Sequence, residues 1–296
     1  MAHEHRTDRR SLQIALVITT MFLLVELVGG LVAGSLALVS DAGHMFSDVL
    51  AFILSLGAIT LATRLPTKQQ TYGFGRAEVF AAFANSLLLI AVSAGILWEA
   101  YQRVLNPAPI QGFLMGTVAA AGLVSNVAVA YLLHGSQNVN VRSSFLHVIG
   151  DAVSSAAVIV AAVWIALTGE TIIDPILSGL ISIIIVVSAA RIIRETLVTL
   201  LQFTPRDVDF DAVVADMKAV EGVSGVHHVH LWSLSSNINV LDAHVYSCER
   251  DTLKIEELKR KIKTRLLNYH ILHSTLEFEC EECKDCTLVE VVGRNP

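Results

Sequence analysis

Six long runs of apolar residues dominate the first two thirds of the chain. They cover residues 12–32, 36–62, 79–105, 110–133, 145–167 and 175–193. Each run is near or above the length of about 20 residues that a helix needs to cross the hydrocarbon core of a bilayer. Short polar or proline-containing segments separate the runs. The pattern therefore predicts a transmembrane domain of six helices over residues 12–204, after a polar tail over residues 1–11.

After about residue 205 the pattern becomes that of a small soluble domain. Apolar residues recur at helical spacing after Asp207 and again after Asp251, and either aspartate can cap the helix that follows it. Residues 226–233, 238–247 and 274–279 alternate between apolar and polar positions, as strands with one buried face do. The order αββαβ predicts a ferredoxin-like, metallochaperone-like domain over residues 205–296.

Composition agrees with a membrane protein that carries a soluble extension. Of the 296 residues, 53% are hydrophobic and only 16% are charged. The net charge is −6, and the sequence has no basic stripe and no interleaving of basic and aromatic residues. We therefore expect the lipid bilayer as the main surroundings and no nucleic-acid partner.

Positive charges are distributed unevenly among the segments that connect the apolar runs. They gather in the N-terminal tail, near the second and fourth connections and at the end of the sixth run. These residues are Arg6, Arg9, Arg10, Arg64, Lys68, Arg76, Arg142, Arg191 and Arg194. The opposite connections carry Glu170 and Asp174, with Arg103 as the main exception. Since short cytoplasmic loops are enriched in Lys and Arg, we expect both termini in the cytoplasm.

Two of the apolar runs contain the same polar pair, a histidine followed four residues later by an aspartate. The pairs are His44 with Asp48 and His147 with Asp151. Residues i and i+4 share one face of a helix, so two such helices face to face offer two imidazole nitrogens and two carboxylates. That set suits a tetrahedral divalent metal, above all Zn²⁺. The alternative is four polar groups that satisfy one another, but the repetition of the pair favours a metal site.

Two further acids lie within the apolar runs. For Glu26 we expect a structural hydrogen bond to a neighbouring helix, with a part in the ion path as the alternative. Asp41 precedes His44 by about one helical turn. It could lie next to the metal ligands without binding the ion, form part of the access route, or cap a helix.

The C-terminal domain has its own candidate metal ligands. They are His227, His228, His230, His244, His273, Glu277 and Glu279, all on predicted strands or at their ends. A hairpin with its turn near Ser236 would bring His230 close to His244. A histidine on a strand is usually only a solvated side chain, but the convergence of several on one small sheet favours a second metal site.

Four cysteines occur in the chain, all in its final third, and three of them are Cys280, Cys283 and Cys286. This clustering favours thiolate metal ligands in a reducing compartment over a disulfide framework. Cys283 and Cys286 are the candidate ligands, and His3 or His5 could complete the set. The alternative is a reduced, solvated tail.

These features together resemble the cation diffusion facilitator family. The closest resemblance is to its zinc-transporting branch, which includes bacterial zinc and cobalt–zinc–cadmium exporters and the animal ZnT proteins. It covers nearly the whole chain and is most specific at residues 35–48, 72–78, 147–151 and 229–232.

The resemblance implies a homodimer with apposed cytoplasmic domains, in a bacterial inner membrane. It implies export of zinc, and also of cadmium or cobalt, from the cytoplasm in exchange for protons. It assigns the transport ligands to His44, Asp48, His147 and Asp151, and a structural or regulatory Zn²⁺ in the cytoplasmic domain to His230, His244 and Glu279.

Exchange fits the chemistry of these ligands, because protons and zinc compete for the same donor atoms. Two other classes of protein remain as alternatives. An intramembrane metallohydrolase needs an open coordination position and a general base, whereas four protein ligands close the site. A membrane-bound metal sensor or storage protein would not need six spans. We therefore expect a transporter without enzymatic activity.

Overall fold

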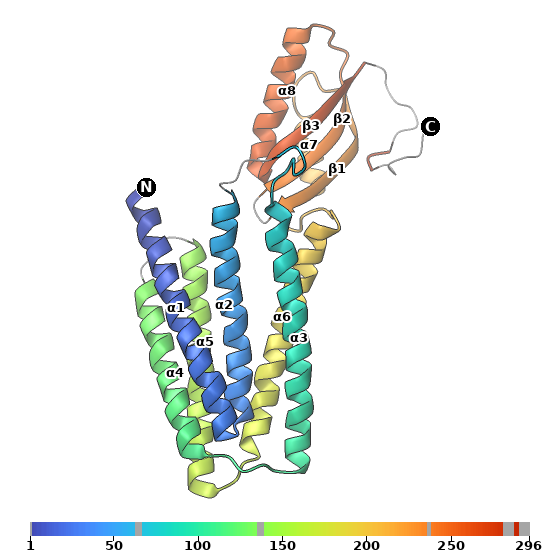
Figure 1. Ribbon diagram of the computed structural model, residues 1–296. Coiled ribbons are helices and arrows are strands. Elements are labelled where there is room, and N and C mark those ends of the chain that lie inside the picture. The colour runs from blue at the N-terminus through green and yellow to red at the C-terminus, as the bar shows by residue number, and fades with distance from the viewer. Residues whose placement is uncertain (1, 63–66, 135–138, 236–237, 281–286, 290–296) are drawn as a thin grey trace. The chain divides into compact units, whose positions relative to one another are not determined.

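The computed structural model describes residues 2–62, 67–134, 139–235, 238–280 and 287–289 (Figure 1). The chain divides into two compact units. The first comprises Met1–Thr60 and Ala81–Ile193, and the second comprises Leu61–Phe80 and Arg194–Pro296.

Six long helices account for the N-terminal two thirds of the chain. They are α1 (Ala2–Ala33), α2 (Leu36–Ala62), α3 (Gly75–Leu105), α4 (Gly112–Leu133), α5 (Val139–Thr168) and α6 (Ile173–Leu200). Among the described residues, α1, α3, α4, α5 and α6 contain stretches long and apolar enough to cross a membrane. In α2, 27 residues long, Asp41 and Asp48 are the only acidic residues and no Lys or Arg occurs. The prediction of six apolar helices is thus confirmed, although α1 begins at Ala2 and includes the predicted tail.

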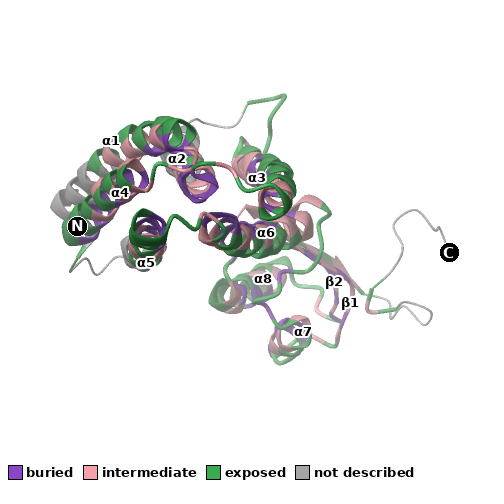
Figure 2. Cartoon of the chain, turned by 90° about the horizontal axis from the view of Figure 1, so that it is seen from below, coloured by how far each residue is buried: buried purple, intermediate pink, exposed green. Residues whose placement is uncertain are grey.

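The outer faces of these helices carry large apolar side chains. Phe113, Tyr131, Val160 and Leu167 are exposed, as are many similar residues. Figure 2 colours long stretches of these helices as exposed. In water, apolar surface of this extent marks an interaction site or a cause of aggregation. A bilayer supplies apolar surroundings, and the helical backbone needs no hydrogen bonds from it.

Small residues allow the helices of the first unit to approach closely. α4 packs along both α5 and α1. A Cβ atom built on Gly29 of α1 would lie 2.6 Å from Val118 of α4, and one built on Gly116 of α4 would lie 3.3 Å from Ala162 of α5. Close backbone approach of this kind is typical of helix packing in membranes.

The N-terminus of α2 is capped by a residue from α6. Asp174 is fully buried and accepts hydrogen bonds from Ser35 Oγ (2.6 Å), Leu36 N (2.7 Å) and Ala37 N (3.2 Å). The carboxylate satisfies two of the backbone N–H groups that a helix leaves open at its N-terminus. The cap therefore ties the start of α2 to the start of α6.

The C-terminal part of the second unit has the predicted order αββαβ. Its elements are α7 (Phe210–Lys218), β1 (Gly225–Ser235), β2 (Ile238–Tyr246), α8 (Thr252–Leu266) and β3 (Ile271–Glu279). The sheet has the order β1-β2-β3, with β2 antiparallel to β1 and parallel to β3. Asp251 caps α8 as predicted. The prediction that Asp207 caps α7 is wrong: Asp209 is the cap, because the helix begins two residues later than expected.

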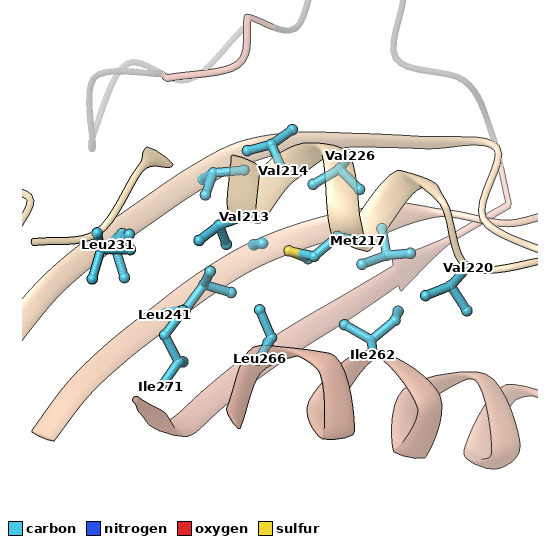
Figure 3. Packing of buried hydrophobic residues seen from close by; sticks show 14 of the residues in the cluster. Val213, Val214, Met217, Val220, Val226, Leu231, Leu241, Ile262, Leu266 and Ile271 are labelled. Atoms are coloured by element: carbon cyan, nitrogen blue, oxygen red, sulfur yellow. The ribbon is translucent and has the colours of Figure 1, made fainter. Parts of the chain in front are cut away.

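The core of this domain lies between the sheet and its two helices. Val213 and Met217 of α7, Leu241 of β2, and Ile262 and Leu266 of α8 belong to one buried cluster (Figure 3). Along β2, Leu241, Ala243 and Val245 are buried, whereas the alternate residues Asp242, His244 and Tyr246 are partly exposed. The polar face of the sheet is therefore the face that carries His244.

Candidate metal sites

Three of the four predicted transport ligands lie together in the first unit. His44 and Asp48 occupy successive turns of α2, and Asp151 belongs to α5. His44 Nε2 is 3.4 Å from Asp151 Oδ1. One donor atom from each of the three residues lies within 4.8 Å of the others. The arrangement brings an imidazole nitrogen and two carboxylates to one point between two helices, which is a donor set that Zn²⁺ binds.

His147 belongs to α5, one turn before Asp151. Its backbone position puts it on the same face of the helix as Asp151. Its side chain lies outside the described part of the chain, so its role as a fourth ligand stays a prediction.

Two side chains of the cluster are partly exposed. The exposed fractions of the His44 and Asp151 side chains are 26% and 14%.

Asp41 lies beside the cluster and is tied to the helix that supplies Asp151. It is 3% exposed, and its Oδ1 accepts a hydrogen bond of 3.0 Å from Ser154 Oγ of α5. Asp41 does not cap α2, since Asp174 does so. Of the predicted roles for Asp41, a position next to the metal ligands agrees best with its hydrogen bond to Ser154.

Glu26 is buried in α1, with an exposed fraction of 1%. In the described part of the chain its Oε2 atom has no hydrogen-bond partner. The interhelical hydrogen bond that we expected is therefore not formed by this oxygen.

The C-terminal domain holds a second cluster, formed by His227, His244 and Glu279. His244 Nδ1 is 2.7 Å from Glu279 Oε1, and His227 Nε2 is 3.1 Å from Glu279 Oε2. One donor atom from each residue lies within 4.8 Å of the others. Glu277 is also near, with Oε2 at 3.5 Å from His244 Nε2.

His230 does not belong to this cluster, although we predicted it there with His244 and Glu279. The cause is an irregularity in the pairing of β1 with β2. His227 pairs with His244 and His230 pairs with Asp242, so that three steps along β1 match two along β2. His228, with φ of 51°, lies in this bulge. The imidazole ring of His230 contacts that of His228, with 5.1 Å between the ring centroids. The ring of His228 in turn stacks on that of His244, with 4.6 Å between the centroids.

The cysteine cluster is only partly described. Cys280 is exposed. Cys283 and Cys286 lie outside the described residues. The segment that follows them returns to β1, where Thr287 O and Leu288 O accept hydrogen bonds from His228 N (3.3 Å) and Val229 N (2.9 Å).

Comparison with known proteins gives a match over both units. Residues 12–201 match the family model of the cation efflux transmembrane domain. Residues 205–279 match the model of the cytoplasmic domain of cation efflux proteins.

Curated relatives match over nearly their whole length. The chain is 40% identical to the zinc transporter ZitB of Pectobacterium atrosepticum, over 96% of this chain and 91% of that protein. It is 36% identical to the zinc transporter ZitB of Escherichia coli strain K12, over 99% of this chain and 98% of that protein. It is 33% identical to the cadmium, cobalt and zinc/H(+)-K(+) antiporter of Bacillus subtilis, over 95% of this chain and 93% of that protein.

Proposed function

Because the chain belongs to the cation diffusion facilitator family, in its zinc-transporting branch, we propose that it exports zinc from the cytoplasm in exchange for protons. The observation that carries this proposal is the cluster of His44, Asp48 and Asp151 between two apolar helices, with donor atoms within 4.8 Å of one another. The names of the relatives, a zinc transporter and a cadmium, cobalt and zinc/H(+)-K(+) antiporter, support it. Cadmium and cobalt, named for the Bacillus subtilis relative, are further candidate substrates.

The ligand types account for the choice of metal. Imidazole nitrogen favours zinc, cadmium and cobalt over magnesium, calcium and manganese, which prefer oxygen ligands. With His147 as the fourth ligand, two neutral imidazoles and two carboxylates would make the loaded site formally neutral. A neutral complex crosses the low-dielectric interior at a lower cost than a bare divalent ion.

Coupling to protons follows from the same donor atoms. Histidine and carboxylate must lose their protons before they bind a metal, so zinc binding releases protons and protons displace zinc. If the helices open the cluster alternately to each side, a pH gradient drives zinc out of the cell.

The proposal includes the arrangement in the membrane. Both termini and the C-terminal domain are assigned to the cytoplasm of a bacterial cell by the distribution of Lys and Arg. The domains are assigned to residues 1–11, 12–204 and 205–296. The match to a cytoplasmic domain of cation efflux proteins supports a homodimer through that domain. A regulatory or structural zinc ion there is assigned to His227, His244 and Glu279.

Zinc flux into sealed inverted vesicles tests the function. Vesicles with purified wild-type protein and an acidic interior should take up zinc, and their interior pH should rise. Asp48→Ala and Asp151→Ala should each abolish uptake, because each removes one of the two carboxylates of the cluster. Glu99→Ala, which alters an exposed acid that pairs with Arg103, is the matched control.

The outcome also separates the alternatives. A sensor or storage protein would bind zinc without flux, and a metallohydrolase would act without vectorial transport. Uptake that is indifferent to the pH gradient would refute the exchange, and wild-type rates in Asp48→Ala or Asp151→Ala would refute the assignment of the site.

A further inference from the structure

The carboxyl group of Glu26 is buried in α1, and its two oxygens differ in their surroundings. One of its oxygens has no hydrogen-bond partner in the described part of the chain, and the residue is 1% exposed. A polar group left in this state costs free energy in a protein interior, and more so at membrane depth. A role limited to joining helices gives no reason for the oxygen that is left without a partner.

The carboxyl group lies against α4, on the side that faces the α5 turn after Asp151. A Cβ atom built on Gly122 of α4 would overlap Glu26 Oε1 and would lie 3.7 Å from Ser155 Oγ. Glycine at this position therefore leaves the room that the carboxyl group occupies. Ser155 Oγ donates to the carbonyl oxygen of Asp151 (3.1 Å) and accepts from Asn126 Nδ2 (3.3 Å). The carboxyl group thus lies on the same side of Gly122 as Ser155, which bonds to the backbone of the candidate metal ligand Asp151.

The charged groups that face Glu26 belong to the metal cluster and its surroundings. Asp41 of α2 and Asp151 of α5 are near enough for their charges to act on Glu26. From α4, the described neighbours Gly122 and Asn126 do not titrate. His44 lies beyond Asp151, at 3.4 Å from it. A zinc ion in the cluster would therefore add positive charge close to Glu26. When the ion leaves, the described titratable groups around Glu26 would be Asp41, Asp151 and the imidazole of His44.

We propose that Glu26 carries a proton in the transport cycle without being a ligand of the metal. A proton binds the Glu26 carboxylate from water when the cluster is empty, and it returns to water when zinc binds nearby. The exchange needs no bond to the metal, because it is driven by the charge of the ion. The proposal rests on the zinc–proton exchange proposed above and adds a proton site outside the atoms for which zinc and protons compete.

The test counts protons released on zinc binding to the full-length protein in detergent, with a pH indicator in weakly buffered solution. Glu26→Gln keeps the shape of the side chain but cannot exchange a proton. It should bind the same amount of zinc as wild type and release about one proton fewer for each ion bound at the cluster. Glu26→Asp should restore the release. Glu99→Gln is the control, since Glu99 is half exposed and pairs with Arg103 on the same helix.

Vesicle experiments separate a proton carrier from a structural residue. In Glu26→Gln, net zinc uptake driven by a pH gradient should fall by more than about tenfold. Zinc–zinc exchange at equal pH, which moves no net protons, should continue near the wild-type rate. Equal loss of both fluxes, or wild-type proton release in Glu26→Gln, would overturn the role of Glu26. Absence of proton-coupled flux in the wild type would instead overturn the proposed function.

Discussion

At the scale of single residues, the assignment of the C-terminal cluster depends on one extra residue in β1. His227 and His230 are both partly buried on the same strand, but only His227 lies opposite His244 and within 3.1 Å of Glu279 Oε2. The bulge at His228 shifts the register between them. The bulge also lies where Thr287 and Leu288 bond to β1. The irregular register therefore places His227, and not His230, opposite His244 and beside Glu279.

The two histidines should therefore differ in their effect on zinc binding. In a full-length Asp48→Ala background, which removes the transport cluster, His227→Ala should weaken zinc binding by the C-terminal domain at least about tenfold. Loss of even an outer partner of a ligand commonly costs about 10- to 100-fold. His230→Ala is the matched control and should retain wild-type affinity. Titration with a zinc indicator measures both, and a larger effect of His230→Ala would contradict the cluster described here.

At the scale of elements, α2 is the helix whose position matters most for the transport cluster. It supplies both His44 and Asp48. Its N-terminus is capped by Asp174 of α6. Ser40 of α2 also lies 3.2 Å from Ser182 of α6, through their hydroxyl oxygens. α6 supplies no residue to the described cluster, yet it holds the helix that does.

Removal of this cap should affect both stability and transport. Asp174→Ala should lower stability by about 1–2 kcal/mol, the usual cost of losing a helix cap, and should reduce zinc flux because α2 is no longer held at its N-terminus. Asp174→Asn keeps one acceptor oxygen and should lose less. Thermal unfolding in detergent and vesicle flux are the measurements. Glu170→Ala, an exposed acid just before α6, should behave as wild type.

At the scale of the whole molecule, the chain combines a membrane unit and a soluble domain that each contain a cluster of metal-ligand type. The first cluster lies between helices that must move if the ion is to leave. The second lies on a sheet with its own apolar core, which has no evident need to move. This difference fits a transported ion in the first and a retained ion in the second.

The prediction that Cys283 and Cys286 bind zinc can be tested by zinc stoichiometry. Both residues lie outside the described part of the chain, and two thiolates would supply half of a tetrahedral zinc site. We expect the full-length protein to bind more zinc than the two described clusters hold, and Cys283→Ser with Cys286→Ser to remove the excess without abolishing transport. Equilibrium dialysis of wild type and double variant decides this. Cys248→Ser, at an exposed cysteine elsewhere in the domain, is the control.

The sequence by itself determined the features that depend on local periodicity. The apolar runs predicted six long helices, and the alternation after residue 205 predicted the order αββαβ, because side-chain direction repeats every 3.6 residues in a helix and every two in a strand. The spacing of His44 and Asp48 put both on one face of a helix for the same reason.

Only the tertiary structure decided which distant groups meet. Asp174 caps a helix that begins 138 residues earlier in the chain, and no local pattern marks that pairing. His227 takes the position predicted for His230 because a bulge, stabilised by edge contacts, breaks the alternation. Glu26 could be recognised as a buried acid from its apolar run. That it lies beside Gly122 and within reach of the charge on Asp151 depends on how α1, α4 and α5 pack, and packing is a property of the whole chain.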